Sequence, residues 1–150
     1  MFEAIVIGGG FAGLSATMYL ARARRRVLLV DAGEPRNRFA DASHGFLGMD
    51  GKSPAAIRTA GRAELAAYGN VSFFDGKAVD AVEEEEGFTI TMNDGRTEKA
   101  RRLVLAFAGE PHLPSRSGFP LPNRESLQPA VWEARAEHGE PLWFPVSAPQ

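Results

Sequence analysis

The residues best suited to chemistry form a glycine-rich turn near the amino terminus. The run Gly8-Gly9-Gly10-Phe11-Ala12-Gly13 fits the pattern G-x-G-x-x-G. An apolar run at 4–7 precedes it, as expected for a buried strand, and residues 13–24 follow with helical spacing of apolar side chains. A strand, a glycine turn and a helix in this order predict a site for the pyrophosphate of a dinucleotide.

The physics of such a turn assigns a different task to each glycine. Gly8 allows the tight turn, and Gly10 lets the backbone approach a pyrophosphate with no side chain in the way. Gly13 lets the helix pack close to the strand. The first amides of the helix have no acceptor within it, and the helix dipole adds partial positive charge at the same place. The other interpretation of these glycines is a plain strand-to-helix turn.

Asp31 completes the pattern, because it ends a second buried strand predicted over 27–30. A carboxylate there accepts hydrogen bonds from the ribose hydroxyls of an adenosine. It would repel a 2′-phosphate, so NADP is disfavoured at this site. The alternative is a solvated strand end. The residues alone predict an adenine dinucleotide and leave FAD and NAD open.

The remaining elements alternate in a way that predicts a three-layer α/β fold. Ser53-Pro54 is a good helix start, with the helix running to Tyr68 and stopping at Gly69. Strands with antiparallel pairing are expected on either side of the turn at 93–95. The predicted strands after the helix cover 71–74, 88–92, 96–100 and 103–106.

Composition narrows the range of partners. The 150 residues carry a net charge of −2 and no cysteine, which excludes disulfides and thiolate metal sites within them. Neither nucleic acid nor a membrane is expected as a partner, and the absence of a signal peptide predicts a cytoplasmic protein. The basic run at 22–26 is interpreted as a solvated helix end, and Glu83–Glu86 as a solvated turn of the meander.

The chain changes character near Ala106. Eight of the ten prolines and both tryptophans follow it. Because proline removes an amide donor and restricts the preceding residue, regular structure is not expected over most of the tail. We therefore predict a folded segment over 1–106 and a divergent, proline-rich and disordered tail over 107–150, with one short helix at 130–138.

The first 106 residues resemble a known family. The runs IVIGGGFAGLSATMYLARARRRVLLVDAGEPRNRF and SHGFLGMDGKSP are similar to the thioredoxin-reductase-like class of FAD-dependent pyridine-nucleotide–disulfide oxidoreductases. The similarity continues through Asn93–Arg96 to Leu103–Ala106. It implies a Rossmann-like FAD-binding fold with a parallel sheet and a small antiparallel meander, present here as an incomplete fold.

The resemblance also implies roles for individual residues. The glycine turn would hold the FAD pyrophosphate and Asp31 the adenosine ribose. His44 would bind the flavin or orient its own loop, and Val79 would pair with adenine through its backbone or lie in the core as a strand residue. Arg36 and Arg38 would contact the adenosine end or be merely exposed. The implied cofactor-binding residues are Gly8, Gly10, Phe11, Ala12, Gly13, Asp31, Ala32, Arg36, Arg38, His44, Gly48 and Val79, with no catalytic residue or metal ligand assigned.

The sequence also departs from the family. Ala106 is followed by Phe107-Ala108-Gly109 where Ala-Thr-Gly is usual, and neither a Cys-x-x-Cys pair nor a second glycine motif for NAD(P)H is present. These differences predict a truncated or frameshifted member: the FAD-binding part of an FAD-dependent NAD(P)H oxidoreductase. One alternative is a non-catalytic FAD-binding module, which would act alone, as a homodimer or with a partner chain. The others are an inactive fragment and an NAD-binding dehydrogenase domain.

Overall fold

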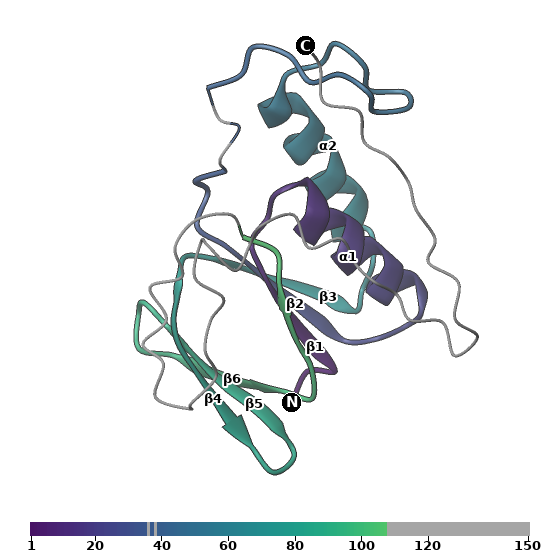
Figure 1. Cartoon of the computed structure of the whole chain (residues 1–150). Coiled ribbons are helices and arrows are strands. Elements are labelled where there is room, and N and C mark those ends of the chain that lie inside the picture. The colour runs from purple at the N-terminus through teal and green to yellow at the C-terminus, as the bar shows by residue number, and fades with distance from the viewer. Residues whose placement is uncertain (36, 38, 108–150) are drawn as a thin grey trace, which may run out of the picture. The chain divides into compact units, whose positions relative to one another are not determined.

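Four short apolar runs pair side by side into a parallel sheet (Figure 1). The computed structural model of the chain describes residues 1–35, 37 and 39–107. Within them the strand order is β3-β2-β1-β7, with every neighbouring pair parallel. The bounds are β1 Ala4–Ile7, β2 Val27–Asp31, β3 Val71–Asp75 and β7 Leu103–Leu105.

Two helices, α1 (Phe11–Arg22) and α2 (Pro54–Ala66), pack on one face of this sheet. The predicted start of α2 is confirmed, because the Ser53 hydroxyl accepts a hydrogen bond from the Ala56 amide at 3.2 Å and Pro54 is the first helical residue. Its predicted end is two residues too late. The amide of Tyr68 already bonds the carbonyl of Leu65, three residues back, so the last turn tightens before Gly69 is reached.

A separate antiparallel sheet is formed by β4 (Ala78–Glu84), β5 (Gly87–Met92) and β6 (Thr97–Ala100). The predicted turn at 93–95 is confirmed, with the Gly95 amide bonded to the Met92 carbonyl. The prediction of a solvated turn for the whole run Glu83–Glu86 is wrong in part, because Glu83 and Glu84 belong to β4. The Glu84 carboxylate accepts from Thr89 on the neighbouring strand β5 and from Lys99 on β6, each at 2.7 Å, and these cross-strand contacts favour a strand there.

The two faces of the parallel sheet are buried against different layers. Successive side chains of a strand point to opposite faces, so β1 and β2 each contribute to two cores. Ile5, Ile7, Leu28 and Val30 pack with Phe74 and the meander residues Ile90, Met92 and Ala100. Val6, Val27 and Leu29 pack with Leu14 of α1 and Leu65 of α2. The order meander, sheet, helices confirms the three-layer α/β prediction.

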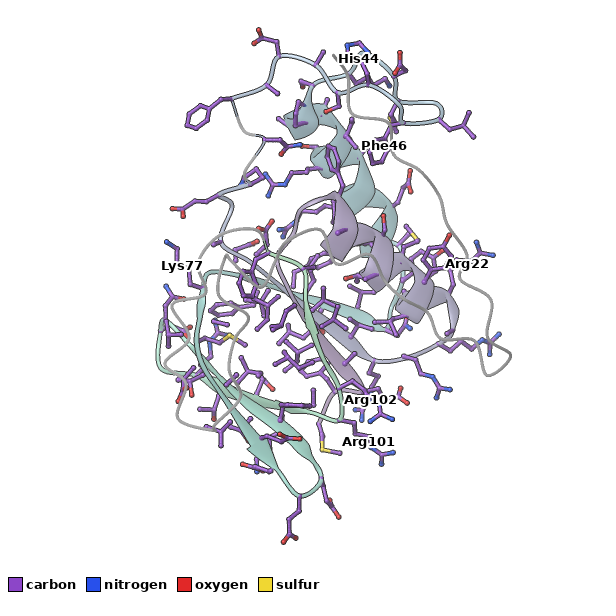
Figure 2. All side chains as sticks on the ribbon, viewed as in Figure 1. Arg22, His44, Phe46, Lys77, Arg101 and Arg102 are labelled. Atoms are coloured by element: carbon purple, nitrogen blue, oxygen red, sulfur yellow. The ribbon has the colours of Figure 1, made fainter. Side chains whose placement is uncertain are left out.

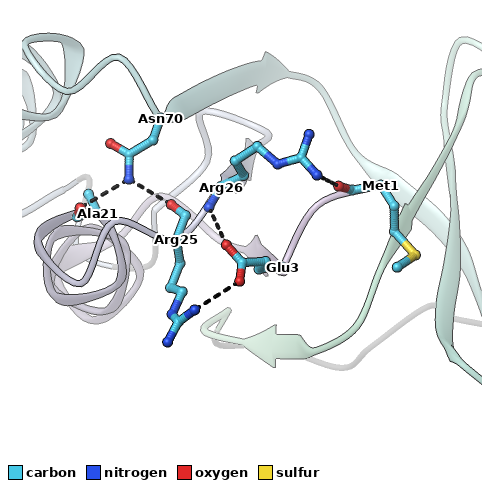
Figure 3. A network of polar contacts seen from close by, with 6 residues as sticks. All are labelled: Met1, Glu3, Ala21, Arg25, Arg26 and Asn70. Carbon is cyan, nitrogen blue, oxygen red and sulfur yellow. Dashed lines mark hydrogen bonds and ion pairs between the residues drawn. The ribbon is translucent and has the colours of Figure 1, made fainter.

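A polar network connects the amino ends of the strands in the parallel sheet (Figure 3). The Glu3 carboxylate accepts from the Arg25 guanidinium at 3.1 Å and from the Arg26 amide at 3.0 Å. The Asn70 side chain donates to the carbonyls of Ala21 at 3.0 Å and Arg25 at 2.7 Å. These bonds connect the amino ends of β1, β2 and β3. The glycine turn lies at the opposite, carboxyl ends of the strands.

Some predictions fall outside the described residues. The tail from 108 onward, its short helix at 130–138, and the positions of Arg36 and Arg38 are among them. Phe107, the first tail residue, packs at the margin of the core shared by the sheet and the meander.

The helix-side core predicts a large effect of truncating Leu65, whose side chain is 0% exposed. Leu65→Ala should lower the free energy of unfolding by about 2–5 kcal/mol, because it removes buried methyl groups and leaves a cavity. The matched substitution Leu47→Ala, at a fully exposed leucine, should change it by less than about 0.5 kcal/mol. Urea denaturation of both variants measures the difference, and equal values would contradict the assigned core.

The network at Glu3 predicts a dependence of stability on pH. The hydrogen bond from the Arg26 amide, with that of Arg25 adding to it, lowers the pKa of Glu3 below its ordinary value of 4.5. A lowered folded-state pKa gives stability that is present above the unfolded value and is lost as the pH falls through the folded value. Glu3→Gln should therefore be less stable than the wild type at about pH 7, with the difference shrinking toward about pH 3.

Urea denaturation across that pH range tests this expectation. Glu85→Gln, at an exposed glutamate of the β4–β5 turn, is the matched control. A Glu3→Gln deficit that stayed constant over the whole range would show that the carboxylate charge is not its source.

Candidate dinucleotide site

The glycine turn lies at the carboxyl end of β1 and allows α1 to approach the strand closely. Gly8 has φ of 110°, in the region that favours glycine, and its amide donates to the Val30 carbonyl at 2.8 Å. A Cβ on Gly13 would overlap the Gly8 carbonyl oxygen, and one on Gly8 would lie 2.7 Å from the Ala106 carbonyl oxygen. The predicted packing role of Gly13 is confirmed. Gly8 also has a packing role, because it lies against Ala106, the residue that follows β7.

Gly10 is the N-cap of α1, and neither its backbone conformation nor its described neighbours require a glycine there. Its φ of −74° is open to any residue, and a Cβ there would have no neighbour within 4 Å. No side chain caps this helix end, and no acid lies in its first turn. The helix therefore starts with amides that lack an intrahelical acceptor, beside open space at Gly10. That donor set fits a pyrophosphate.

Asp31 is buried at the end of the neighbouring strand. Its side chain is 7% exposed, so the interpretation as a solvated strand end is wrong. One carboxylate oxygen accepts from the Gly33 amide at 3.0 Å, and the other accepts from the Arg58 guanidinium at 2.6 Å. A Cβ on Gly9 would overlap this carboxylate. The middle glycine of the motif, to which the sequence pattern assigned no task, thus makes room for the acid.

Two arginines of α2 at this site escaped the sequence analysis. The Arg58 guanidinium also donates through Nε to the Gly9 carbonyl at 3.0 Å. Arg62 lies 3.7 Å from the Asp31 carboxylate, bonds Asp75 at 2.8 Å and sits 4.8 Å above the Phe73 ring. The available signal was their spacing of four residues on one helix face. With two cations beside it, the charge of Asp31 alone no longer argues against a 2′-phosphate.

The loop that precedes α2 packs on the start of α1. The Asp50 carboxylate accepts from the Gly45 amide at 2.8 Å, and the His44 ring lies 3.5 Å from the same carboxylate. Phe46 meets Phe11 edge-on, with ring centroids 4.8 Å apart. Figure 2 shows Phe46 turned toward α1 and His44 farther out on the loop. The aromatic pair therefore brings this loop to the glycine turn, while the His44 side chain is exposed.

The segment after β2 meets the start of the meander on the other side of Asp31. The Gly76 amide donates to the Asp31 carbonyl at 2.9 Å, and Lys77 pairs with Glu34 at 3.1 Å. Val79 is 40% exposed, so its interpretation as a core residue is wrong. The pairing of β4 with β5 shifts between Ala78 and Asp80, which makes Val79 the extra residue of a β-bulge.

The structure brings some of the predicted site residues together, while others lie apart or outside the described residues. The structure brings the glycine turn and Asp31 together, and Phe11 links the turn to the loop that contains His44 and Gly48, where Gly48 has φ of 77°. Ala32 is exposed directly after Asp31. Arg36 and Arg38 lie outside the described residues.

Comparison with known proteins identifies the family. The model of the pyridine nucleotide-disulphide oxidoreductases matches residues 2–136. The chain belongs to this family. Its match extends past residue 106, where the resemblance recognised from the sequence ended.

Relatives within the family place the chain near the thioredoxin reductases. It is 37% identical over 124 residues to a probable thioredoxin reductase of Arthroderma benhamiae, covering 79% of this chain and 31% of the relative. It is 33% identical over 107 residues to the thioredoxin reductase tcpT of Claviceps purpurea, covering 69% of this chain and 33% of the relative. The predicted resemblance is confirmed, and the chain spans about a third of the length of these relatives.

Solved structures agree in fold. An oxidoreductase from Agrobacterium tumefaciens matches with a TM-score of 0.69 and 46% identity over 79% of this chain and 40% of its own. A putative thioredoxin reductase, TrxB, from Bacillus anthracis matches with a TM-score of 0.68 and 34% identity over 71% of this chain and 36% of its own. In the described part of the chain, neither helix is long and apolar enough to span a membrane.

The geometry predicts different consequences of substitution at Gly13 and at Gly10 of the motif. Gly13→Ala should lower the free energy of unfolding by more than about 2 kcal/mol, because the new methyl group would collide with the Gly8 carbonyl. Gly10→Ala, which places its methyl group in open space, should cost less, about 0.5–1 kcal/mol, because alanine is only a poorer N-cap residue than glycine. Thermal and urea denaturation of the ligand-free variants measure both, and a stable Gly13→Ala variant would contradict the close approach of α1 to β1.

Proposed function

We propose that this chain holds FAD as the flavin-binding part of a thioredoxin-reductase-like oxidoreductase. The observation that carries the proposal is the pairing of two anchors at adjacent strand ends. One is the uncapped start of α1 at Gly10, which suits a pyrophosphate, and the other is the buried carboxylate of Asp31, which suits a ribose.

The remaining predicted residues extend this assignment along the cofactor. We assign the adenosine end to Ala32, Arg36 and Arg38, and to the backbone of Val79, whose place in a β-bulge supports pairing with adenine. We assign the isoalloxazine end to the loop of His44 and Gly48, which Phe46 fastens to the helix start. The protein's contribution is to bind and orient the cofactor, and FAD itself supplies the capacity to accept and pass on a hydride.

The redox partners belong to the proposal as well. Since the relatives are named thioredoxin reductases, we assign the chain to oxidoreduction with NAD(P)H as the expected electron donor. The 150 residues include no cysteine, so thiol–disulfide exchange would have to use thiols that they do not supply. A module that binds FAD without turnover shares every binding residue, and is distinguished by measuring NADPH oxidation.

A second candidate is an NAD-binding dehydrogenase domain, because Asp31 suits the ribose of NAD equally well. The family to which the chain belongs and the loop at 43–52 favour FAD. The two cofactors differ in a simple observable, since bound oxidised flavin gives the protein a yellow absorbance.

Titration of the purified chain with FAD and with NAD tests the proposal. We expect yellow protein, and a stabilisation of about 2.7 kcal/mol when FAD is at 100 times its dissociation constant. Gly10→Val should abolish FAD binding, since a branched side chain would occupy the space that the pyrophosphate needs, whereas Asp31→Ala should weaken it less. A colourless protein stabilised by NAD alone would support the dehydrogenase, and normal FAD uptake by Gly10→Val would overturn the assigned pose.

A further inference from the structure

Arg58 joins the two anchors of the proposed site through one side chain. Its Nε donates to the Gly9 carbonyl at 3.0 Å, and a terminal nitrogen donates to the Asp31 carboxylate at 2.6 Å. From this geometry we infer that Arg58 is a positioning residue for the dinucleotide, which sets the spacing between the pyrophosphate anchor and the ribose anchor. The inference rests on the proposed function and adds a residue outside both the glycine motif and the acid.

The chemistry of the guanidinium group explains why this position holds arginine. Its N–H donors form a rigid, planar fork, so one side chain reaches two acceptors at a fixed distance from each other. A lysine ammonium is a single point charge on a flexible stem and does not fix two acceptors in this way. Arg58 therefore links the turn after β1 to the end of β2 from a third element, α2.

Burial gives this link its strength. The side chains of Arg58 and Asp31 are 17% and 7% exposed, so water screens their ion pair little. The Gly33 amide holds the other oxygen of the carboxylate. An ionised carboxylate has about four acceptor positions, so these two bonds leave capacity for ribose hydroxyls. A carboxylate held before the ligand arrives need not be ordered on binding, which improves affinity.

Arg62 provides a matched comparison one helical turn away. It lies farther from the Asp31 carboxylate, at 3.7 Å, and its shorter ion pair is with the exposed Asp75 at 2.8 Å. Its guanidinium stacks on Phe73 and has no assigned contact with the glycine turn. It therefore adds positive charge near Asp31 without connecting the two anchors.

The test is a double-mutant cycle on FAD affinity in the full 150-residue chain. The variants are Arg58→Gln, Asp31→Asn and the double variant, with Arg62→Gln as the control, and quenching of flavin fluorescence gives each dissociation constant. Arg58→Gln should weaken FAD binding about tenfold and Arg62→Gln less than about threefold. In the Asp31→Asn background, Arg58→Gln should cost less than about twofold, because the group it positions is already altered.

A merely structural effect of Arg58 would weaken binding equally in both backgrounds, and that result would overturn the inference. Unchanged affinity of Arg58→Gln would overturn it too. Should Arg58→Gln fail to fold by circular dichroism, Arg58→Lys replaces it in the cycle. Its expected loss of FAD affinity is at least about threefold in the wild-type background and less than about twofold in the Asp31→Asn background. A wild-type chain that bound no FAD would refute the proposed function together with this inference, whereas wild-type binding without coupling would refute the inference alone.

Discussion

The close approach of α1 to β1 is the constraint on which the site depends. Because a side chain on Gly13 would overlap the Gly8 carbonyl, the helix can start directly above the strand only with glycine there. The same approach presents the uncapped amides at Gly10 at the carboxyl edge of the sheet. Close packing and an uncapped helix start are thus two results of one backbone arrangement, and the pattern of glycines permits both.

The layers around the sheet keep this arrangement in place. Helices cover one face and the meander covers the other, so β1 and β2 are buried on both sides. Parallel strands buried in this way read as continuous apolar runs. The network around Glu3 holds the amino ends of the strands (Figure 3). Asp31 and Arg58 lie at the carboxyl ends, beside the glycine turn. The proposed cofactor would therefore meet groups that packed strands and helices hold in place.

The electrostatics around Asp31 differ from those of an isolated acid. Asp31 is surrounded by the guanidinium groups of Arg58 and Arg62, and Arg62 also pairs with Asp75. The formal charges of these four groups sum to zero. Under the proposed function, recognition of a ribose here would depend on the direction of hydrogen bonds more than on net charge. This balance explains how a carboxylate that is almost completely buried can stay beside the backbone of Gly9.

The sequence by itself determined the order of the elements other than β4, which was not predicted, together with the helix start at Ser53, the turn at 93–95, the glycine motif and the acid that follows it. These features depend on local rules, namely apolar periodicity, capping and the conformational freedom of glycine. Only the tertiary structure decided that Gly9 makes room for Asp31, that Arg58 bridges them and that Val79 occupies a bulge. Each of these depends on contacts between segments far apart in the chain, such as the 49 residues that separate Gly9 from Arg58, and no local pattern encodes such a distance.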